Sequence, residues 1–189
     1  MYFCIAGLLD DVSQNDIRKK ALRILRQYGL GVTALLLPQH VSLKISFATD
    51  RVDDLVDYFG ELCLKYRAVR VDFQNLEVVA IEELGEKSGL LWYTVRENTD
   101  LRKIHNQLNN DLPPLLGIVN SSIDGNAFRF HSTITYGQKT YEEYQEIHKA
   151  IASEFEEVST RIDKLAIFCC VENAIVAGKF FTYKIGRLT

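Results

Sequence analysis

Two short stretches of the chain each place a histidine two residues before a hydroxyl. His40 and Ser42 lie in HVSL, and His131 and Thr133 lie in HSTI. Histidine can take up or release a proton near neutral pH, and a hydroxyl can donate a hydrogen bond to an oxygen on which charge develops. If two such pairs met at one point, they could cleave a phosphodiester, because one imidazole would act as base and the other as acid.

The residues around both histidines have the pattern of half-buried strands. In HVSLKISF, residues 40–47, apolar and polar side chains alternate, and successive side chains of a strand point to opposite faces. His40 and Ser42 are then predicted to project from one face, roughly 6 to 7 Å apart. The same holds for His131 and Thr133, so each pair forms a short polar row.

The elements that position these rows repeat along the chain. Each half is predicted to hold a strand, a helix, a histidine strand and a second helix. Besides the two histidine strands, the predicted strands lie in 2–9, 69–83, 89–98, 163–172 and 174–188, with turns at 86–89 and 172–173. The predicted helix caps are Ser13 or Asn15, Asp50, Thr99 and Thr140, the last in a capping box with Glu143. Gly29 and Gly31 are predicted to end the first helix. Only residues 111–127 stand outside the duplication, as a long irregular connection and candidate lid.

Composition and charge exclude several classes of protein. The net charge of −3 over 189 residues gives no broad positive field, so we expect no duplex DNA partner. The short apolar N-terminal run is closed by Asp10 and Asp11, which predicts a buried strand and no signal peptide or membrane span. The four cysteines lack CxxC spacing, so we expect buried thiols in a reducing cytoplasm, no metal site and no cofactor. We expect one domain, 1–189, that acts as a monomer.

The four histidines have a structural interpretation as well as a functional one. His40 and His131 could be polar groups at strand edges, satisfied by hydrogen bonds to their own neighbours. The functional interpretation is favoured because their two motifs lie at matching points of the duplication. His105 and His148 each lie beside an inward isoleucine on a predicted helix without a paired hydroxyl, so we expect both at the surface or its boundary.

HVSL and HSTI, about half a chain apart in a duplicated α/β chain, resemble the paired motifs of the 2H phosphoesterase superfamily. That superfamily includes 2'-5' RNA ligase-like proteins and cyclic nucleotide phosphodiesterases, and its motif is histidine, hydrophobe, serine or threonine, hydrophobe. HVSL matches at every position, whereas HSTI has Ser132 where a hydrophobe is usual. The resemblance implies an α+β fold of two lobes with pseudo-twofold symmetry, in which two mainly antiparallel sheets form a central cleft and helices pack outside. It also implies metal-independent chemistry on 2',3'-cyclic phosphates, 2'-5' linkages or cyclic nucleotides.

Three further side chains are candidate substrate contacts. Arg129 shares strand parity with His131, and Lys44 shares it with His40, so either cation could face a phosphate or could be a solvated charge at a strand end. Tyr136 is similar in position to an aromatic residue of the family that stacks on a base. Strict alternation places Tyr136 on the opposite face, so this role requires a bend near the following glycine.

The leading hypothesis is a phosphodiesterase that acts on 2',3'-cyclic phosphate, 2'-5' linked RNA ends or small cyclic nucleotides. His40 and His131 would supply the acid and the base, in an order that the sequence leaves open, and Ser42 and Thr133 would contact the phosphate. Two alternatives use the same pocket. One is a module that binds a nucleotide or RNA end without turnover, and the other is a 2'-5' RNA ligase that runs the reaction in reverse.

Overall fold

The computed structural model describes residues 1–83, 86–173 and 178–189. Its strands are β1 (Tyr2–Leu9), β2 (His40–Ala48), β3 (Val69–Glu83), β4 (Glu86–Val95), β5 (His131–Thr140), β6 (Val158–Cys170) and β7 (Phe181–Arg187). Its helices are α1 (Asp11–Tyr28), α2 (Val52–Lys65), α3 (Thr99–Leu116) and α4 (Tyr141–Ile151), with short 3-10 turns η1 (Thr33–Leu35) and η2 (Ala152–Glu154).

One antiparallel sheet connects all the described strands. Its order is β2-β1-β6-β3-β4-β5, and β7 pairs with β6. This order is symmetric about the junction of β6 and β3, because β2 corresponds to β5 and β1 to β4. The predicted α+β fold with a pseudo-twofold plan is therefore confirmed. The two sheets that we expected are the halves of one continuous sheet, since β3 and β6 pair over Val69–Phe73.

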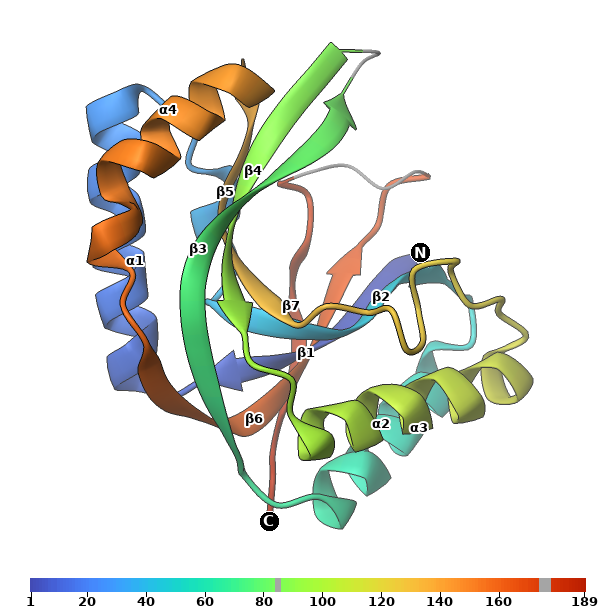
Figure 1. The fold of residues 1–189 in the computed structure, drawn as a ribbon. Coiled ribbons are helices and arrows are strands. Elements are labelled where there is room, and N and C mark those ends of the chain that lie inside the picture. The colour runs from blue at the N-terminus through green and yellow to red at the C-terminus, as the bar shows by residue number, and fades with distance from the viewer. Residues whose placement is uncertain (84–85, 174–177) are drawn as a thin grey trace.

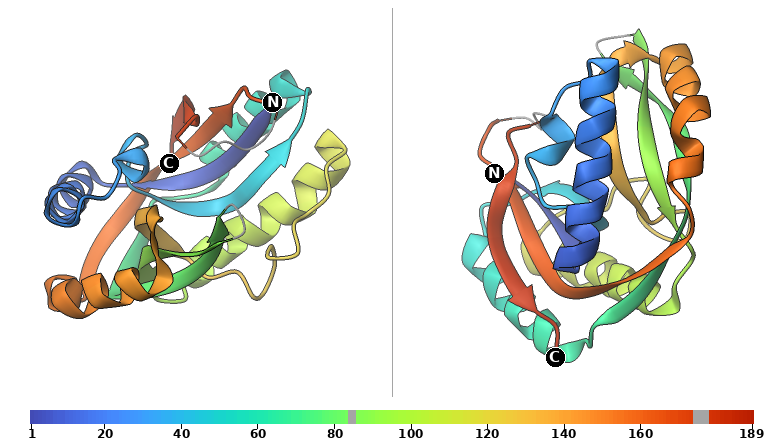
Figure 2. Two further views of the ribbon diagram at one scale, coloured as in Figure 1. Left: turned by 90° about the horizontal axis from the view of Figure 1, so that it is seen from above. Right: turned by 90° about the vertical axis from the view of Figure 1, so that its left-hand side faces the viewer.

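The helices form two pairs, one over each half of the sheet. α1 packs against β5 and α4 against β3 and β4, whereas α2 packs against β7 and α3 against β2. Figure 1 shows α1 and α4 on the left and α2 and α3 at the lower right, and Figure 2 shows the first pair from outside. The helix that follows β1 thus covers the half that contains β5, and the helix that follows β4 covers the half that contains β2. This exchange links the two halves.

The helix starts agree with the sequence to within a few residues. Asp10, not Ser13 or Asn15, caps α1, and its carboxylate accepts hydrogen bonds from two backbone amides of the first turn. Asn98 caps α3 one residue before the predicted cap. The capping box of α4 is confirmed, since Thr140 accepts from the Glu143 amide and the Glu143 side chain accepts from the Thr140 amide.

The start of α2 differs from the prediction. Asp50 does not cap this helix. Arg51 is at the capping position, and its backbone amide donates to the hydroxyl of Thr49 at 3.1 Å. The acidic side chains of the first turn, Asp53 and Asp54, supply the negative charge that a helix N-terminus favours.

The stretch 111–127 is irregular only in its second part, because α3 continues to Leu116. Pro113 lies inside the helix and lacks the amide that would bond to the carbonyl of Asn109. The side-chain amide of Asn120 donates to that carbonyl at 2.8 Å instead. A polar partner from the following loop therefore allows a proline in the last turn of the helix.

Two segments of the predicted hairpins have other bounds in the structure. Residues 86–89, predicted as a turn, begin β4, and the backbone of Glu83 pairs with that of Glu86. The predicted closing strand over 174–188 is β7 from Phe181 onward, and its residues 174–177 lie outside the described part of the chain.

Within the described residues no helix is both long and apolar enough to cross a membrane.

The four cysteines are free thiols. Cys63, Cys169 and Cys170 are buried as predicted, whereas Cys4 is only half-buried. Its thiol group has nevertheless lost its contact with water, and this desolvation raises the pKa of Cys4 to about 12, so the thiol stays protonated at neutral pH.

Candidate active site

The two histidines begin the two corresponding strands β2 and β5 and are held in the same way. The Nδ1 atom of His40 lies 2.7 Å from the Pro38 carbonyl oxygen, and that of His131 lies 2.8 Å from the Arg129 carbonyl oxygen. A carbonyl only accepts hydrogen bonds, so Nδ1 must donate in both rings. In the neutral imidazole Nε2 then carries the free lone pair. Both rings thus hold their reactive nitrogen in the form that accepts a proton.

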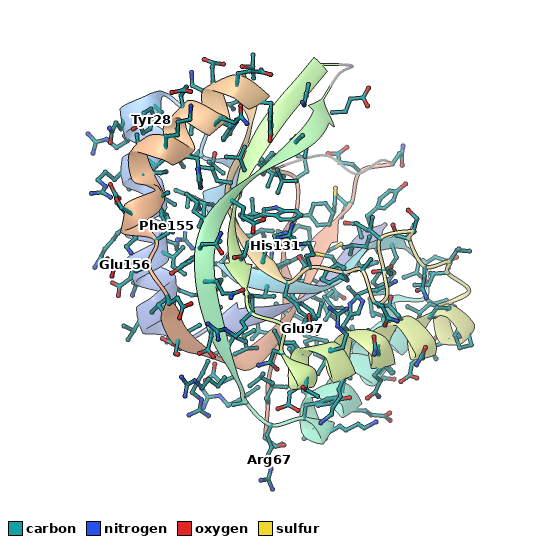
Figure 3. All side chains as sticks on the ribbon, viewed as in Figure 1. Tyr28, Arg67, Glu97, His131, Phe155 and Glu156 are labelled. Atoms are coloured by element: carbon teal, nitrogen blue, oxygen red, sulfur yellow. The ribbon has the colours of Figure 1, made fainter. Side chains whose placement is uncertain are left out.

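An aromatic ring supports each imidazole. His131 stacks on Trp92 of β4, with ring centroids 3.6 Å apart and 14° between the planes. His40 contacts Phe168 of β6 edge-on, with centroids 4.8 Å apart. Figure 3 shows His131 near the centre of the molecule, between the two helix pairs. These contacts restrict how each imidazole can rotate.

Both imidazoles are neutral at pH 7 because their surroundings disfavour the charged form. Burial lowers the pKa of His40. Burial also lowers the pKa of His131, from 6.5 to about 4, although the hydrogen bond to the Arg129 carbonyl opposes the shift; the charge on His40 lowers this pKa further. His40 and Thr133, which follows His131 by two residues on β5, line one cavity. A bound anion there would favour protonation of one of them.

A cavity of about 410 Å³ joins the two histidine strands. Its lining includes His40 and Gln39 from one half, Thr133 and Tyr136 from the other, and the apolar side chains of Leu37 and Phe180. Two of the predicted site residues do not line the cavity: Ser42, half-buried on β2 beside Ala6, and His131, half-buried at the start of β5. A larger hollow of about 600 Å³ lies between α1 and the first residues of β6 and includes no histidine, so we assign the site to the smaller cavity.

A β-bulge in β5 turns Tyr136 toward the cavity. Trp92 pairs with Thr133 and Leu91 pairs with Thr135, so Ile134 is one extra residue in β5. An extra residue reverses the alternation of the side chains that follow. Tyr136 therefore shares the cavity with Thr133. From the sequence, Tyr136 could reach this face only through a bend near Gly137. In the structure the bulge at Ile134, three residues before Gly137, changes the face instead.

A bulge at the corresponding place in β2 has the opposite consequence for Lys44. Ala6 pairs with Ser42 and Ile5 pairs with Lys44, so Leu43 is the extra residue. Strand parity had placed Lys44 on the same face as His40. After the bulge that parity no longer holds, and the side chain of Lys44 points away from the face that carries His40 and Ser42.

The ammonium group of Lys44 lies in a buried polar cluster. Its Nζ atom donates to Asn109 Oδ1 at 2.6 Å, to Asn120 Oδ1 at 2.7 Å and to Asp124 Oδ2 at 2.5 Å. The side chains of Lys44 and Asp124 are 1% and 2% exposed. Three acceptors use all three donors of the ammonium. The interpretation of Lys44 as a phosphate contact does not fit this placement, and its role here is to hold the loop after α3.

His105 belongs to the same region and is fully buried, so the prediction of a surface or boundary position is wrong. Its Nδ1 lies 2.7 Å from the carbonyl oxygen of Leu43, the bulged residue, and its Nε2 accepts from the Gly125 amide at 3.0 Å. The ring also stacks on Phe128. His105 thus joins the β2 bulge to the loop that leads to His131. His148 is half-buried, as predicted.

Arg129 lies beside the site but is paired. Its guanidinium bonds to the carboxylate of Glu77 at 2.6 Å and lies 5.9 Å from the ring centroid of Trp92. Its side chain is 58% exposed, so the pair is weak and can exchange partners. The positive charge of Arg129 also contributes to the low pKa of His131, after burial and the charge of His40.

Sequence reasoning missed Trp92 and Phe168 as supports of the imidazoles. Both lie in strands that were predicted, but which strands flank the histidines follows from the sheet order and not from local pattern. Among the described residues, no group of three histidine, cysteine or acidic side chains is arranged to hold a metal ion.

The fold and the site define an α+β protein of two related halves, each of which contributes one histidine followed two residues later by a hydroxyl. Residues 11–169 match the family model of the 2'-5' RNA ligase superfamily. The chain belongs to that superfamily, and the predicted relationship to the 2H phosphoesterases is confirmed. The sequence matches no curated protein sequence.

Solved structures share the fold over nearly the whole chain. TT0787 of Thermus thermophilus has a TM-score of 0.61 and 14% identity, and the match covers 100% of this chain and 98% of that one. LigT of E. coli, complexed with 3'-AMP, has a TM-score of 0.55 and 11% identity, with 99% and 97% covered. Usb1 of Kluyveromyces marxianus has a TM-score of 0.50 and 13% identity, with 96% of each chain covered. At these identities the similarity shows the fold.

Proposed function

We propose that this protein is a phosphodiesterase that cleaves a 2',3'-cyclic phosphate or a 2'-5' linkage of RNA ends or small cyclic nucleotides. The observation that carries this proposal is the matched state of the two imidazoles. His40 and His131 each donate from Nδ1 to a carbonyl two residues earlier, and each keeps Nε2 for proton transfer. His40 lines the cavity, and His131 lies on β5 two residues before Thr133, which also lines it. Two equivalent proton carriers would suit a reaction that needs a base and an acid at the same phosphorus.

The chemistry follows from this pairing. One Nε2 removes a proton from the attacking water as its oxygen bonds to phosphorus. The other imidazole, protonated, gives its proton to the leaving ribose oxygen as the bond from phosphorus to that oxygen breaks. Thr133, which lines the cavity, donates a hydrogen bond to a non-bridging oxygen, whose charge increases as phosphorus becomes five-coordinate. Ser42 is the second proposed donor, although it lies on β2 outside the cavity lining. The scheme needs no metal, and it leaves open which histidine is the base.

The protonation states support an anionic substrate. Both imidazoles have lowered pKa values, which leaves the base ready but the acid without its proton. A phosphate between them raises the pKa of the nearer ring, because opposite charges favour the charged form. The substrate itself therefore prepares the acid.

The cavity supports a nucleotide as substrate. Its volume of about 410 Å³ lies within the range of small-molecule sites. Tyr136 on its wall would stack on a base, as exposed aromatic rings do. Arg129 would leave Glu77 and bond to the phosphate. LigT of E. coli in complex with 3'-AMP and Usb1 of K. marxianus with uridine monophosphate are related structures that hold nucleoside monophosphates.

The test is a substrate panel assayed with EDTA present. The panel contains 2',3'-cyclic nucleotides, 2'-5' linked oligonucleotides and cyclic dinucleotides, and it compares the wild type with His40→Ala and His131→Ala. His148→Ala, which removes a half-buried histidine from α4, is the matched control. We expect turnover by the wild type and the control only.

Three results would contradict the proposal. Equal turnover by all four proteins would remove the two histidines from the reaction. Tight nucleotide binding without product would identify a binding module. Joining of 2',3'-cyclic and 5'-hydroxyl ends without hydrolysis would identify a ligase.

A further inference from the structure

A buried hydrogen bond connects the residues next to the two histidines. Ser132 Oγ donates to Gln39 Oε1 at 2.9 Å. Gln39 immediately precedes His40, and Ser132 immediately follows His131. Their residues are 2% and 1% exposed. The two halves of the sheet are thus tied together one peptide away from each reactive ring.

This bond joins two strands that the sheet itself does not connect directly. β2 and β5 are at opposite ends of the strand order and are not neighbours in the sheet. No ladder of backbone hydrogen bonds therefore fixes the distance between them. A bond between side chains at their first residues can do so, because both side chains are enclosed and have little freedom to move.

The bond depends on a serine at a position of the motif that is usually hydrophobic. Ser132 stands where a hydrophobe is usual in the histidine motif. A buried hydroxyl is costly unless it finds a partner, and here the partner comes from the other half of the molecule. A hydrophobe at this position would fill space but would not specify a partner or a distance.

We propose that Gln39 and Ser132 are positioning residues that set the separation of the His40 and His131 imidazoles across the substrate. This inference rests on the proposed function, because a fixed separation matters only if both rings act on one phosphorus. Gln39 also lines the cavity, but its amide oxygen accepts the bond from Ser132, and we assign both side chains an effect through the adjacent backbone. A misplacement of about 1 Å at an active site can cost roughly 100-fold in rate.

A double-variant cycle separates positioning from mere stability. Gln39→Leu and Ser132→Ala each leave one buried polar group without its partner, so both lower the melting temperature. The double variant removes both polar groups, so its melting temperature recovers. If the bond positions the histidines, kcat stays about 10- to 100-fold low in all three variants, while KM changes less than kcat. Ser132→Thr keeps the hydroxyl and should keep most of the activity.

Ser88→Ala is the matched control. Ser88 is also a buried serine in the half that contains β5, and its hydroxyl donates to the Lys139 carbonyl at 2.8 Å, away from both histidines. We expect its loss to lower stability and to leave kcat near the wild-type value. Recovery of both stability and kcat in the Gln39→Leu/Ser132→Ala variant would overturn the inference.

A structural measurement keeps this inference separate from the proposed function. Crystal structures of the wild type and the double variant give the distance between the two Nε2 atoms whether or not a substrate is known. We expect this distance to change by about 1 Å or one imidazole to take two positions. An unchanged, well-ordered pair of imidazoles would contradict the positioning role even in an active enzyme. Absence of turnover in the wild type would contradict only the proposed function.

Discussion

Replacement of Lys44 by methionine tests whether this side chain stabilises the fold or binds substrate. Its ammonium lies 2.5 Å from the Asp124 carboxylate, and the two side chains are 1% and 2% exposed. Lys44→Met leaves that carboxylate buried without its cation, a change that costs about 3 to 5 kcal/mol of unfolding free energy. At about 2 to 4 °C per kcal/mol for a chain of this size, the melting temperature should fall by roughly 6 to 20 °C.

Urea and thermal unfolding measure this loss, and two variants control it. Lys164→Met breaks an ion pair with Asp11, whose side chain is 81% exposed, and should cost no more than about 1 kcal/mol. Lys44→Met combined with Asp124→Asn should recover much of the loss, because no buried charge remains unpaired. A stable Lys44→Met variant with a strongly raised KM would refute this reasoning and restore Lys44 as a phosphate contact.

Three further predictions concern the site. Thr133→Val keeps the shape of the side chain and removes its hydroxyl, so kcat should fall by about 100- to 1,000-fold, as for an oxyanion donor; Ser42→Ala should act in the same direction, and an unchanged kcat would exclude either hydroxyl. Because the pKa of His131 is lowered from 6.5 to about 4, the unfolded chain binds a proton in this window that the folded chain does not, so stability should fall as pH falls from 6.5 to 4. His131→Gln should flatten that part of the pH dependence, and an identical slope in urea titrations would contradict the shift. Binding of 3'-AMP should raise the pKa of His131, measured by NMR, and a constant pKa would show that the phosphate does not lie beside this ring.

The duplicated plan of this fold could be predicted because it follows from local sequence patterns. Alternating strands, amphipathic helices and the two histidine motifs recur in the same order in both halves. That order gave the related positions of His40 and His131 before the sheet was known. The strand order then showed that the relation extends to the whole sheet.

The orientation of residues beyond each motif could not be predicted, because one extra residue reverses it. The bulges lie at Leu43 and Ile134. The one at Leu43 is stabilised by a distant partner, because the His105 ring bonds to the carbonyl of Leu43. Nothing within either strand signals a bulge. Strict alternation therefore misplaced Lys44 and required the wrong bend for Tyr136.

The contacts between the two halves, like the bulges, could not be predicted from the sequence. His105 has a polar side chain beside an apolar helical stripe, which is typical of a boundary position. Its partners come from a strand and a loop that lie far away along the chain. The bond between Gln39 and Ser132 also joins residues from separate halves. Pairing of this kind depends on how the sheet brings its ends together.

The most direct test of the central claim is a double-mutant cycle on the two histidines. Once a substrate is identified, kcat is measured for His40→Ala, His131→Ala and the double variant, with the melting temperature as a check on folding. If both rings act in one reaction, each single variant should lose about 100- to 10,000-fold, and the double variant should lose little more than the worse single variant. Independent, multiplicative losses, or wild-type turnover in either single variant, would contradict the account.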